Sequence, residues 1–236
     1  MSRAPVAFAW IGGALFVAAL LYFLFFYLIE LGRPAVGSGW VRPLALDTGI
    51  FALFAVHHSV MARTAVKSWL AAIVSPGLER SIFVWISSIL LIAVCVFWQG
   101  IPGVAYSVRD PWRWGLYAVQ LAGVLLTVRA SARLDVLELA GVRQARGANR
   151  SKAVGMVGLQ MTGPYTLVRH PVYLGWVAVV FGAPHMTADR LALATISTVY
   201  LIIGTAFEER ALETAFGESY RQYRRQVRWR FLPGLY

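Results

Sequence analysis

Long apolar runs constrain this chain more than any other feature of its sequence. Runs that approach the length needed for a helix to cross a bilayer lie at residues 6–30, 44–62, 81–99, 114–130 and 189–207. Only 14% of the residues are charged, against about 25% in an ordinary soluble domain. Because a helix satisfies its own backbone hydrogen bonds inside a bilayer, the sequence predicts an all-α integral membrane protein.

A sixth apolar run, residues 171–183, is shorter. At about 1.5 Å per residue, a helix of this length reaches only about 20 Å. A turn-rich stretch separates it from the run at 189–207, so we expect residues 171–207 to form a helical hairpin with a short first arm. Such an arm is tolerated at membrane depth where it lines a cavity or packs on protein. The expected fold therefore has about five to six transmembrane helices.

The distribution of basic residues predicts how the chain lies in the membrane. With six spans, seventeen of the 22 lysines and arginines fall on the side that holds both termini, and five fall on the other side. The positive-inside rule then places both termini and the polar connection at 131–170 in the cytoplasm. We expect a bacterial inner-membrane protein whose active site faces the cytoplasm. The first apolar run exceeds the core of a signal peptide, about 7–15 residues, and is expected to be a span.

The chain shows no internal repeat and no long linker, so we expect a single domain. Residues 1–130 would supply the N-terminal transmembrane helices, and residues 131–236 the C-terminal half. Near the C-terminus, apolar and aromatic residues recur at helical spacing while the arginines fall elsewhere on the helical wheel. This pattern predicts an amphipathic helix at the cytoplasmic membrane surface or against the membrane helices. The recurring residues are Phe216, Tyr220, Tyr223 and Val227.

Composition also excludes several classes of function. The net charge of +11 agrees with basic cytoplasmic loops, and we expect no nucleic-acid partner. The four histidines have no metal-binding spacing, so no metal site is expected. Cys95 is a single cysteine inside an apolar run, which gives no disulfide framework.

A polar segment just before the short arm is the first candidate site. Proline fits the first turn of a helix, so Pro171 is expected to begin one, with His170 near its N-cap. Free backbone N–H groups and the helix dipole favour an anion at such a position. Arg169 adds a fixed positive charge. Tyr165 and Tyr173 add aromatic faces and hydroxyl groups.

Two interpretations of this segment remain open. Together, the residues could hold a ligand that has an anionic end and a planar aromatic part. Alternatively, arginine, histidine and tyrosine before a transmembrane helix serve as interfacial residues that fix its position in the membrane.

Three further positions carry possible chemistry. Glu208 and Glu209 directly follow the last apolar run. A carboxylate there can accept hydrogen bonds from a ribose diol, or it can form an ion pair with Arg210 or with the arginines of residues 221–230. His58 ends the second run, where a neutral histidine can act as a base or simply pack. Arg143 in the cytoplasmic connection is either a substrate contact or a positive-inside charge.

In this order and spacing, the motifs resemble the C-terminal half of the isoprenylcysteine carboxyl methyltransferase superfamily, which includes phospholipid N-methyltransferase-like proteins. The matching segments are GPYTLVRHPVYLG at 163–175, FEER at 207–210 and FGESYRQY at 216–223. The N-terminal segments resemble the branch that contains membrane methanethiol S-methyltransferases. They are HHSVMAR at 57–63, LERSIFVWISS at 78–88 and GVRQA at 141–145.

The resemblance implies S-adenosylmethionine as methyl donor, bound in a cytoplasmic pocket of the hairpin and C-terminal helix. It implies a small thiol such as methanethiol, or a lipid-like substrate entering from the bilayer. For the thiol, His58 is the expected base and Arg143 the alternative that stabilises a thiolate. The implied cofactor contacts are Tyr165, Val168, Arg169, His170, Tyr173, Leu174, Glu208 and Glu209.

Different activities on the same scaffold remain open at this point. Relatives that methylate a carboxylate place a basic residue just before the acidic pair, where this chain has Ala206. This departure disfavours a carboxyl substrate such as a prenylcysteine. N-methylation of a lipid amine stays open, and so does a non-methylating role as a reductase or an accessory membrane protein.

Overall fold

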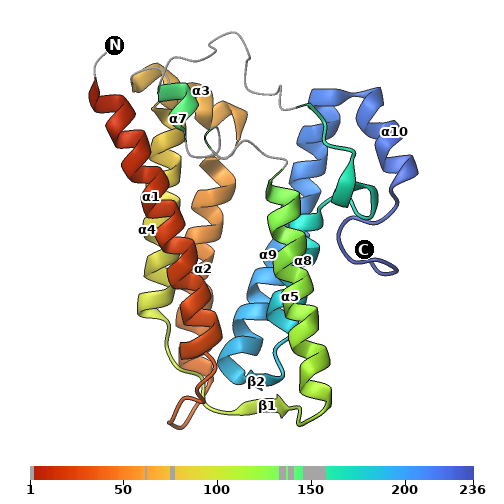
Figure 1. Ribbon diagram of the computed structural model, residues 1–236. Helices are drawn as coiled ribbons and strands as arrows, with labels where there is room; N and C mark the ends of the chain where they lie inside the picture. The colour runs from red at the N-terminus through yellow and green to blue at the C-terminus, as the bar shows by residue number, and fades with distance from the viewer. Residues whose placement is uncertain (1–2, 62, 75–77, 133–136, 138–140, 146–157) are drawn as a thin grey trace. The chain divides into compact units, whose positions relative to one another are not determined.

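The computed structural model describes most of the chain as helices (Figure 1). The described residues are 3–61, 63–74, 78–132, 137, 141–145 and 158–236. Parts of the polar connection expected at 131–170 lie outside them. The chain divides into two compact units, which are described separately below. Unit 1 comprises Met1–Gly103 and Asp135–Ala153, and unit 2 comprises Val104–Leu134 and Val154–Tyr236.

Three long helices form the body of unit 1. They are α1 (Arg3–Phe25), which continues as a π-helical turn over Phe26–Glu30, α2 (Val41–Met61) and α4 (Glu79–Phe97). Helix α4 packs against both α1 and α2. The Trp85 indole N–H donates to the Phe8 carbonyl at 3.1 Å, and the two rings stack with centroids 5.3 Å apart. This contact joins α1 to α4.

The described part of unit 1 also contains two shorter helices, α3 (Thr64–Ile73) and α7 (Val142–Ala145). Helix α7 packs on α1, where Val142 and Ala9 share a small buried cluster. Gly141 precedes α7 with φ +79°, and a Cβ there would lie 2.9 Å from the Ser81 backbone nitrogen. Only a residue without a side chain allows α7 to approach α4 this closely.

Unit 2 contains the expected hairpin. Its short arm is α8 (Pro171–Phe181) and its long arm is α9 (Ala188–Phe216), and the two pack against each other. Helix α9 continues well past residue 207, where the apolar run ends. Helix α5 (Trp112–Ser131) packs against α8, and a 3-10 turn, η2 (Gly163–Thr166), precedes α8. Helix α10 (Glu218–Gln226) follows α9 directly.

Helices α5 and α8 approach closely because both carry a glycine at the contact. A Cβ on Gly175 would lie 2.7 Å from the Gly123 carbonyl oxygen, and it would also collide with the Thr127 hydroxyl. A small residue at such a crossing lets the backbones of two membrane helices pack directly. Gly123 and Gly175 thus set the position of α8, whose first residues carry the candidate site.

Two short strands were not foreseen from the sequence. Strands β1 (Val104–Ser107) and β2 (His185–Thr187) form an antiparallel pair in which Tyr106 faces Met186 and Ser107 faces His185. Strand β1 precedes α5, and β2 connects α8 to α9. The pair lies at the end of unit 2 where α8 ends and α9 begins (Figure 1). Strands this short carry too little periodicity to be separated from a turn.

Four described helices are long and apolar enough to cross a membrane. They are Ala4–Glu30, Val41–Met61, Glu79–Phe97 and Ala188–Phe216, and α8 is a shorter apolar helix. The prediction of a helical membrane fold is therefore confirmed, apart from the short strand pair. The run at 114–130 forms α5 but is not among the four, so the count of five to six spans remains a prediction.

Candidate functional site

The backbone just before α8 is held by the C-terminal tail, residues 227–236, which follows α10. Pro171 is the first residue of α8, as the sequence predicts, and His170 is its N-cap. The Arg169 N–H donates to the Trp229 carbonyl at 3.0 Å, and the His170 N–H donates to the Arg230 carbonyl at 2.8 Å. These two bonds fix the beginning of α8 against a segment about 60 residues later in the chain.

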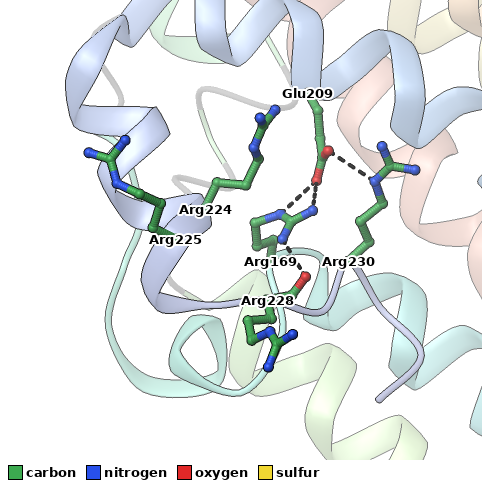
Figure 2. Close-up of a pocket in the computed structure, with 6 residues that line it drawn as sticks. All are labelled: Arg169, Glu209, Arg224, Arg225, Arg228 and Arg230. Atoms are coloured by element: carbon green, nitrogen blue, oxygen red, sulfur yellow. Dashed lines mark hydrogen bonds and ion pairs between the residues drawn. The ribbon is translucent and has the colours of Figure 1, made fainter. Parts of the chain in front are cut away.

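Arg169 forms a buried ion pair with Glu209 of α9 (Figure 2). Its Nε and Nη2 both lie 2.7 Å from Glu209 Oε1, and each side chain is only 5% exposed. Its Nη1 donates to the carbonyls of Val227 and Arg228 at 2.7 and 2.8 Å. The guanidinium therefore connects α8, α9 and the tail through charge-assisted hydrogen bonds.

Glu209 uses its other carboxylate oxygen for a second arginine of the tail. Arg230 Nε donates to Glu209 Oε2 at 3.0 Å. Arg230 also donates to the Tyr236 hydroxyl and lies 4.6 Å from the centre of that ring. One buried carboxylate thus lies between two guanidinium groups, which offset its desolvation cost.

Glu208 has a different environment from its neighbour. Its side chain is 45% exposed, and its Oε2 accepts a hydrogen bond of 2.7 Å from the Tyr173 hydroxyl. His170 Nδ1 lies 3.5 Å from the same oxygen, and the His170 and Tyr173 rings are stacked with centroids 5.3 Å apart. Three polar groups from α8 and α9 therefore converge beside an accessible carboxylate.

His170 has one ring nitrogen without a hydrogen bond. The residue is 7% exposed, and its Nε2 is a buried atom with no hydrogen-bond partner among the described residues, although it lies 3.5 Å from Glu209 Oε1. Burying a polar group without a partner costs free energy. The unpaired Nε2 of His170 therefore carries a desolvation cost that a hydrogen-bonding ligand would relieve.

Tyr165 and Tyr223 extend the site toward α10. The Tyr223 hydroxyl donates to the Tyr165 carbonyl at 2.7 Å. Burial raises the pKa of Tyr223 to about 12. Burial and then the Glu208 charge raise the pKa of Tyr165. Both phenols are neutral near pH 7, so each can act as a hydrogen-bond donor.

The structure brings most of the predicted cofactor residues together in unit 2. His170, Tyr173 and Glu208 contact one another, and Tyr165 lies near Glu208. Glu209 pairs with Arg230, one of the arginines that the ion-pair alternative names, and also with Arg169, which that alternative did not include. Val168 is fully buried, and Leu174 is half-buried. Their roles as cofactor contacts remain predictions.

His58 and Arg143 lie in unit 1. The His58 ring lies on α2 between Phe54 and Phe83, at centroid distances of 5.7 and 5.2 Å. Neither ring nitrogen of the neighbouring His57 has a hydrogen-bond partner within the part of the chain that the structure describes. Arg143 is exposed on α7. The proposed catalytic roles of His58 and Arg143 also remain predictions.

Two residues of the site were not identified from the sequence. Arg230 was one of several arginines available to the glutamates, and nothing local marks it as a partner of Glu209. Tyr220 was assigned only to the apolar face of a helix, yet its buried hydroxyl has no hydrogen-bond partner among the residues described. Burial and then the Glu209 charge raise its pKa. Its place in the FGxxYxxY spacing was the only available signal.

Similar proteins identify the family. Methanethiol S-methyltransferase 1 of Bradyrhizobium diazoefficiens is 35% identical over 234 residues, which cover 90% of this chain and 80% of that protein. Methanethiol S-methyltransferase of Mycobacterium tuberculosis is 38% identical over 194 residues, 82% of this chain and 80% of that protein. The chain belongs to the methanethiol S-methyltransferase family. It is therefore a membrane methyltransferase, and the resemblance inferred from its motifs is confirmed.

A relative of lower identity has a different name. Nurim of Pan troglodytes is 27% identical over 201 residues, which cover 78% of this chain and 76% of that protein. No protein-family model matches the chain, and no solved structure matches it. The assignment to methanethiol S-methyltransferases therefore depends on similarity over most of the chain together with the motifs.

Proposed function

We propose that this protein transfers the methyl group of S-adenosylmethionine to methanethiol. The thiol sulfur forms a bond to the methyl carbon as the sulfonium C–S bond breaks. The products are dimethyl sulfide, S-adenosylhomocysteine and the proton of the thiol. The observation that carries this proposal is the similarity to enzymes named methanethiol S-methyltransferase over 82–90% of the chain.

The geometry of unit 2 supports a site for the methyl donor. Glu208 offers an accessible carboxylate beside Tyr173 and His170, which suits the hydroxyl groups of a ribose. The beginning of α8 suits the carboxylate of the donor, because helix N-termini bind anions. The Tyr165 and Tyr173 rings offer aromatic surfaces for the adenine. Bound there, the donor would supply an electrophilic methyl group.

Arg169 and Glu209 support the site in a different way. The Arg169 guanidinium already donates to Glu209 and to two carbonyls of the tail. We propose that this pair positions His170 and the beginning of α8, in addition to any contact with the donor. Methyl transfer requires the acceptor sulfur, the methyl carbon and the leaving sulfur of the donor to lie in line. Binding residues that are already in position make the transfer faster, because they need no rearrangement.

The acceptor thiol requires deprotonation. A thiol with a pKa of about 8.5–10 is mostly protonated at pH 7, and the thiolate is the nucleophile. We propose His58 as the base, with Arg143 as the alternative that stabilises the thiolate by its charge. A water-poor site would protect the reacting groups from solvation.

We propose an inner-membrane location with the donor site on the cytoplasmic side. With six spans, most of the lysines and arginines fall on the side that holds the termini and the beginning of α8, and basic loops remain in the cytoplasm. Methanethiol is small and apolar, so it can reach the protein through the bilayer, and lipids are the surrounding partners.

The test uses the purified full-length protein in detergent or nanodiscs. Calorimetry with S-adenosylhomocysteine should show binding, and headspace gas chromatography should detect dimethyl sulfide from S-adenosylmethionine and methanethiol. Binding without dimethyl sulfide, but with labelled methyl on a prenylcysteine or a lipid amine, would replace the acceptor. Heat with NADPH and none with S-adenosylhomocysteine would contradict the methyltransferase site.

A further inference from the structure

An arginine-rich cavity opens beside the Arg169–Glu209 pair. It has a volume of about 540 Å³ and is formed by the end of α9, α10 and the tail (Figure 2). All of its basic side chains are arginines, and one carboxylate is present. The lining residues are Arg169, Glu209, Arg224, Arg225, Arg228 and Arg230.

The carboxylates around this cavity are shared between arginines. Glu209 serves both Arg169 and Arg230. Glu213 lies 3.4 Å from Arg224 and 3.7 Å from Arg221. In each case one negative charge faces two positive charges. The arginines and glutamates around the cavity therefore keep an excess of positive charge.

The arginines of α10 and of the segment that follows it carry the same excess of positive charge. Glu218 pairs with Arg225 at 2.7 Å and with Arg221 at 2.9 Å. Arg228 makes no ion pair within the described residues, and its guanidinium lies 6.0 Å from the Trp229 ring. Repulsion between these arginines is relieved if an anion enters the cavity.

The chemistry of the lining selects the type of anion. Guanidinium groups present planar pairs of N–H donors that match the oxygens of a phosphate. Arg224 and Arg225 have side chains 48% and 66% exposed, so they can turn toward a ligand. A phosphate offers several oxygens, which suits three or more separate guanidinium groups.

The position of the cavity selects the source of that phosphate. Helix α10 begins two residues after the end of α9, which is long and apolar enough to cross a membrane. The cavity is therefore at the end of a candidate membrane span. Trp229 is 36% exposed beside it, and tryptophan is enriched where membranes meet water. Lipid headgroups are the phosphates concentrated at that level.

We propose that this arginine cavity binds the headgroup phosphate of an anionic phospholipid, through Arg224, Arg225 and Arg228. The site is separate from the methyl-acceptor reaction, and it stands whether or not methanethiol is the substrate. A lipid bound here would contact both α10 and the tail that holds the beginning of α8, so it would stabilise the tail.

The test measures phospholipid binding to the purified full-length protein by native mass spectrometry. Short-chain phosphatidylglycerol is titrated against wild type, Arg228→Gln and Arg225→Gln, with short-chain phosphatidylcholine in a parallel series. Each arginine near a membrane surface changes the affinity for anionic lipid by about fivefold. We therefore expect each variant to weaken phosphatidylglycerol binding by about that factor while phosphatidylcholine binding stays weak.

Arg210→Gln is the matched control. Arg210 is an exposed arginine near the end of α9 that does not line the cavity, so phosphatidylglycerol binding should be unchanged. An equal loss in Arg210→Gln and Arg228→Gln would show general charge attraction and overturn the site. Competition by inorganic phosphate at equal concentration would overturn the lipid as the source. Equal binding of the two lipids by wild type would also overturn the proposal.

Discussion

Arg169 and Glu209, forty residues apart in the chain, form an ion pair in which each side chain is only 5% exposed. The pair joins the residue two positions before α8 to the far part of α9. Arg230 binds the second oxygen of the same carboxylate, so the tail belongs to the same network. The beginning of α8, where the donor site is proposed, is therefore held by this carboxylate together with the two backbone hydrogen bonds to the tail.

Replacing Glu209 with glutamine should destabilise unit 2 strongly. Removing one partner of a buried ion pair leaves the other charge uncompensated, at a cost of about 3–5 kcal/mol. For a chain of this size this corresponds to a loss of about 10 °C in the thermal midpoint, measured in detergent. Glu213→Gln is the control, since this carboxylate is 35% exposed and exposed pairs contribute about 0–1 kcal/mol. Equal midpoints for the two variants would contradict the structural role of Glu209.

Replacing Glu208 with glutamine should weaken donor binding without this loss of stability. Its carboxylate is exposed, so little packing changes, whereas a hydrogen bond to a charged group contributes about 1.5–3 kcal/mol. The dissociation constant of S-adenosylhomocysteine should rise by about 10- to 100-fold in calorimetry. Tyr173→Phe, which removes the hydroxyl that holds Glu208, should have a smaller effect in the same direction. Wild-type affinity in Glu208→Gln would remove Glu208 from the site.

The two adjacent histidines of α2 offer a matched test of the proposed base. His58→Ala should lower the rate of dimethyl sulfide formation at pH 7 by about 10²- to 10⁴-fold. The loss should shrink as pH rises toward the pKa of the thiol, because thiolate then forms without a base. His57→Ala should keep the rate, and Arg143→Gln tests the alternative. If His57→Ala loses the activity and His58→Ala retains it, the assignment of His58 is wrong.

The close approach of α5 and α8 should make Gly175 intolerant of a side chain. A methyl group at Gly175 would lie 2.7 Å from the Gly123 carbonyl oxygen, and overpacking of this kind costs about 1–3 kcal/mol. Gly204→Ala is the control, because no other described group lies within 4 Å of a Cβ there and alanine favours helix by about 1 kcal/mol. Thermal midpoints should fall for Gly175→Ala and hold or rise for Gly204→Ala. A fall of equal size in both would exclude the glycine contact as the cause.

The Tyr223 phenol should ionise at a higher pH than an ordinary tyrosine. Burial raises its pKa to about 12, while unfolded tyrosine has a pKa near 10. The folded state then keeps a proton that the unfolded state loses, so the stability from this residue is complete below pH 10 and is lost between pH 10 and about 12. The difference in ultraviolet absorbance between wild type and Tyr223→Phe should show one phenol ionising near pH 12. A difference centred near pH 10 would contradict the buried hydrogen bond.

At the beginning of α8, the sequence pattern predicts local structure but not long-range contacts. The RHP motif was enough to place a helix start at Pro171, because the proline ring favours the first helical turn and this effect is local. The same motif could not say what Arg169 binds. Its partners at Val227, Arg228 and Glu209 are reached only when the tail folds back on α8. Contacts over such separations leave no periodic trace in a single sequence.

Glu208 and Glu209 show the limit most clearly. They are identical side chains at neighbouring positions, and the sequence left both a sugar contact and an ion pair open for each. On a helix, neighbouring residues point about 100° apart, so α9 directs Glu209 into the buried contact with Arg169 and Arg230 and leaves Glu208 accessible. Which of the two is turned inward depends on how α9 is rotated against α8.

The sequence by itself determined that this chain is a helical membrane protein and which family of methyltransferases it belongs to. Both conclusions depend on the composition of local segments and on the order of the motifs, which can be recognised without knowing how the helices pack. Only the tertiary structure decided that Glu209 is an internal counter-ion, that the tail holds His170, and that five arginines share three carboxylates beside α10. These features arise from contacts between distant segments, whose geometry is set by the packing of α5, α8 and α9.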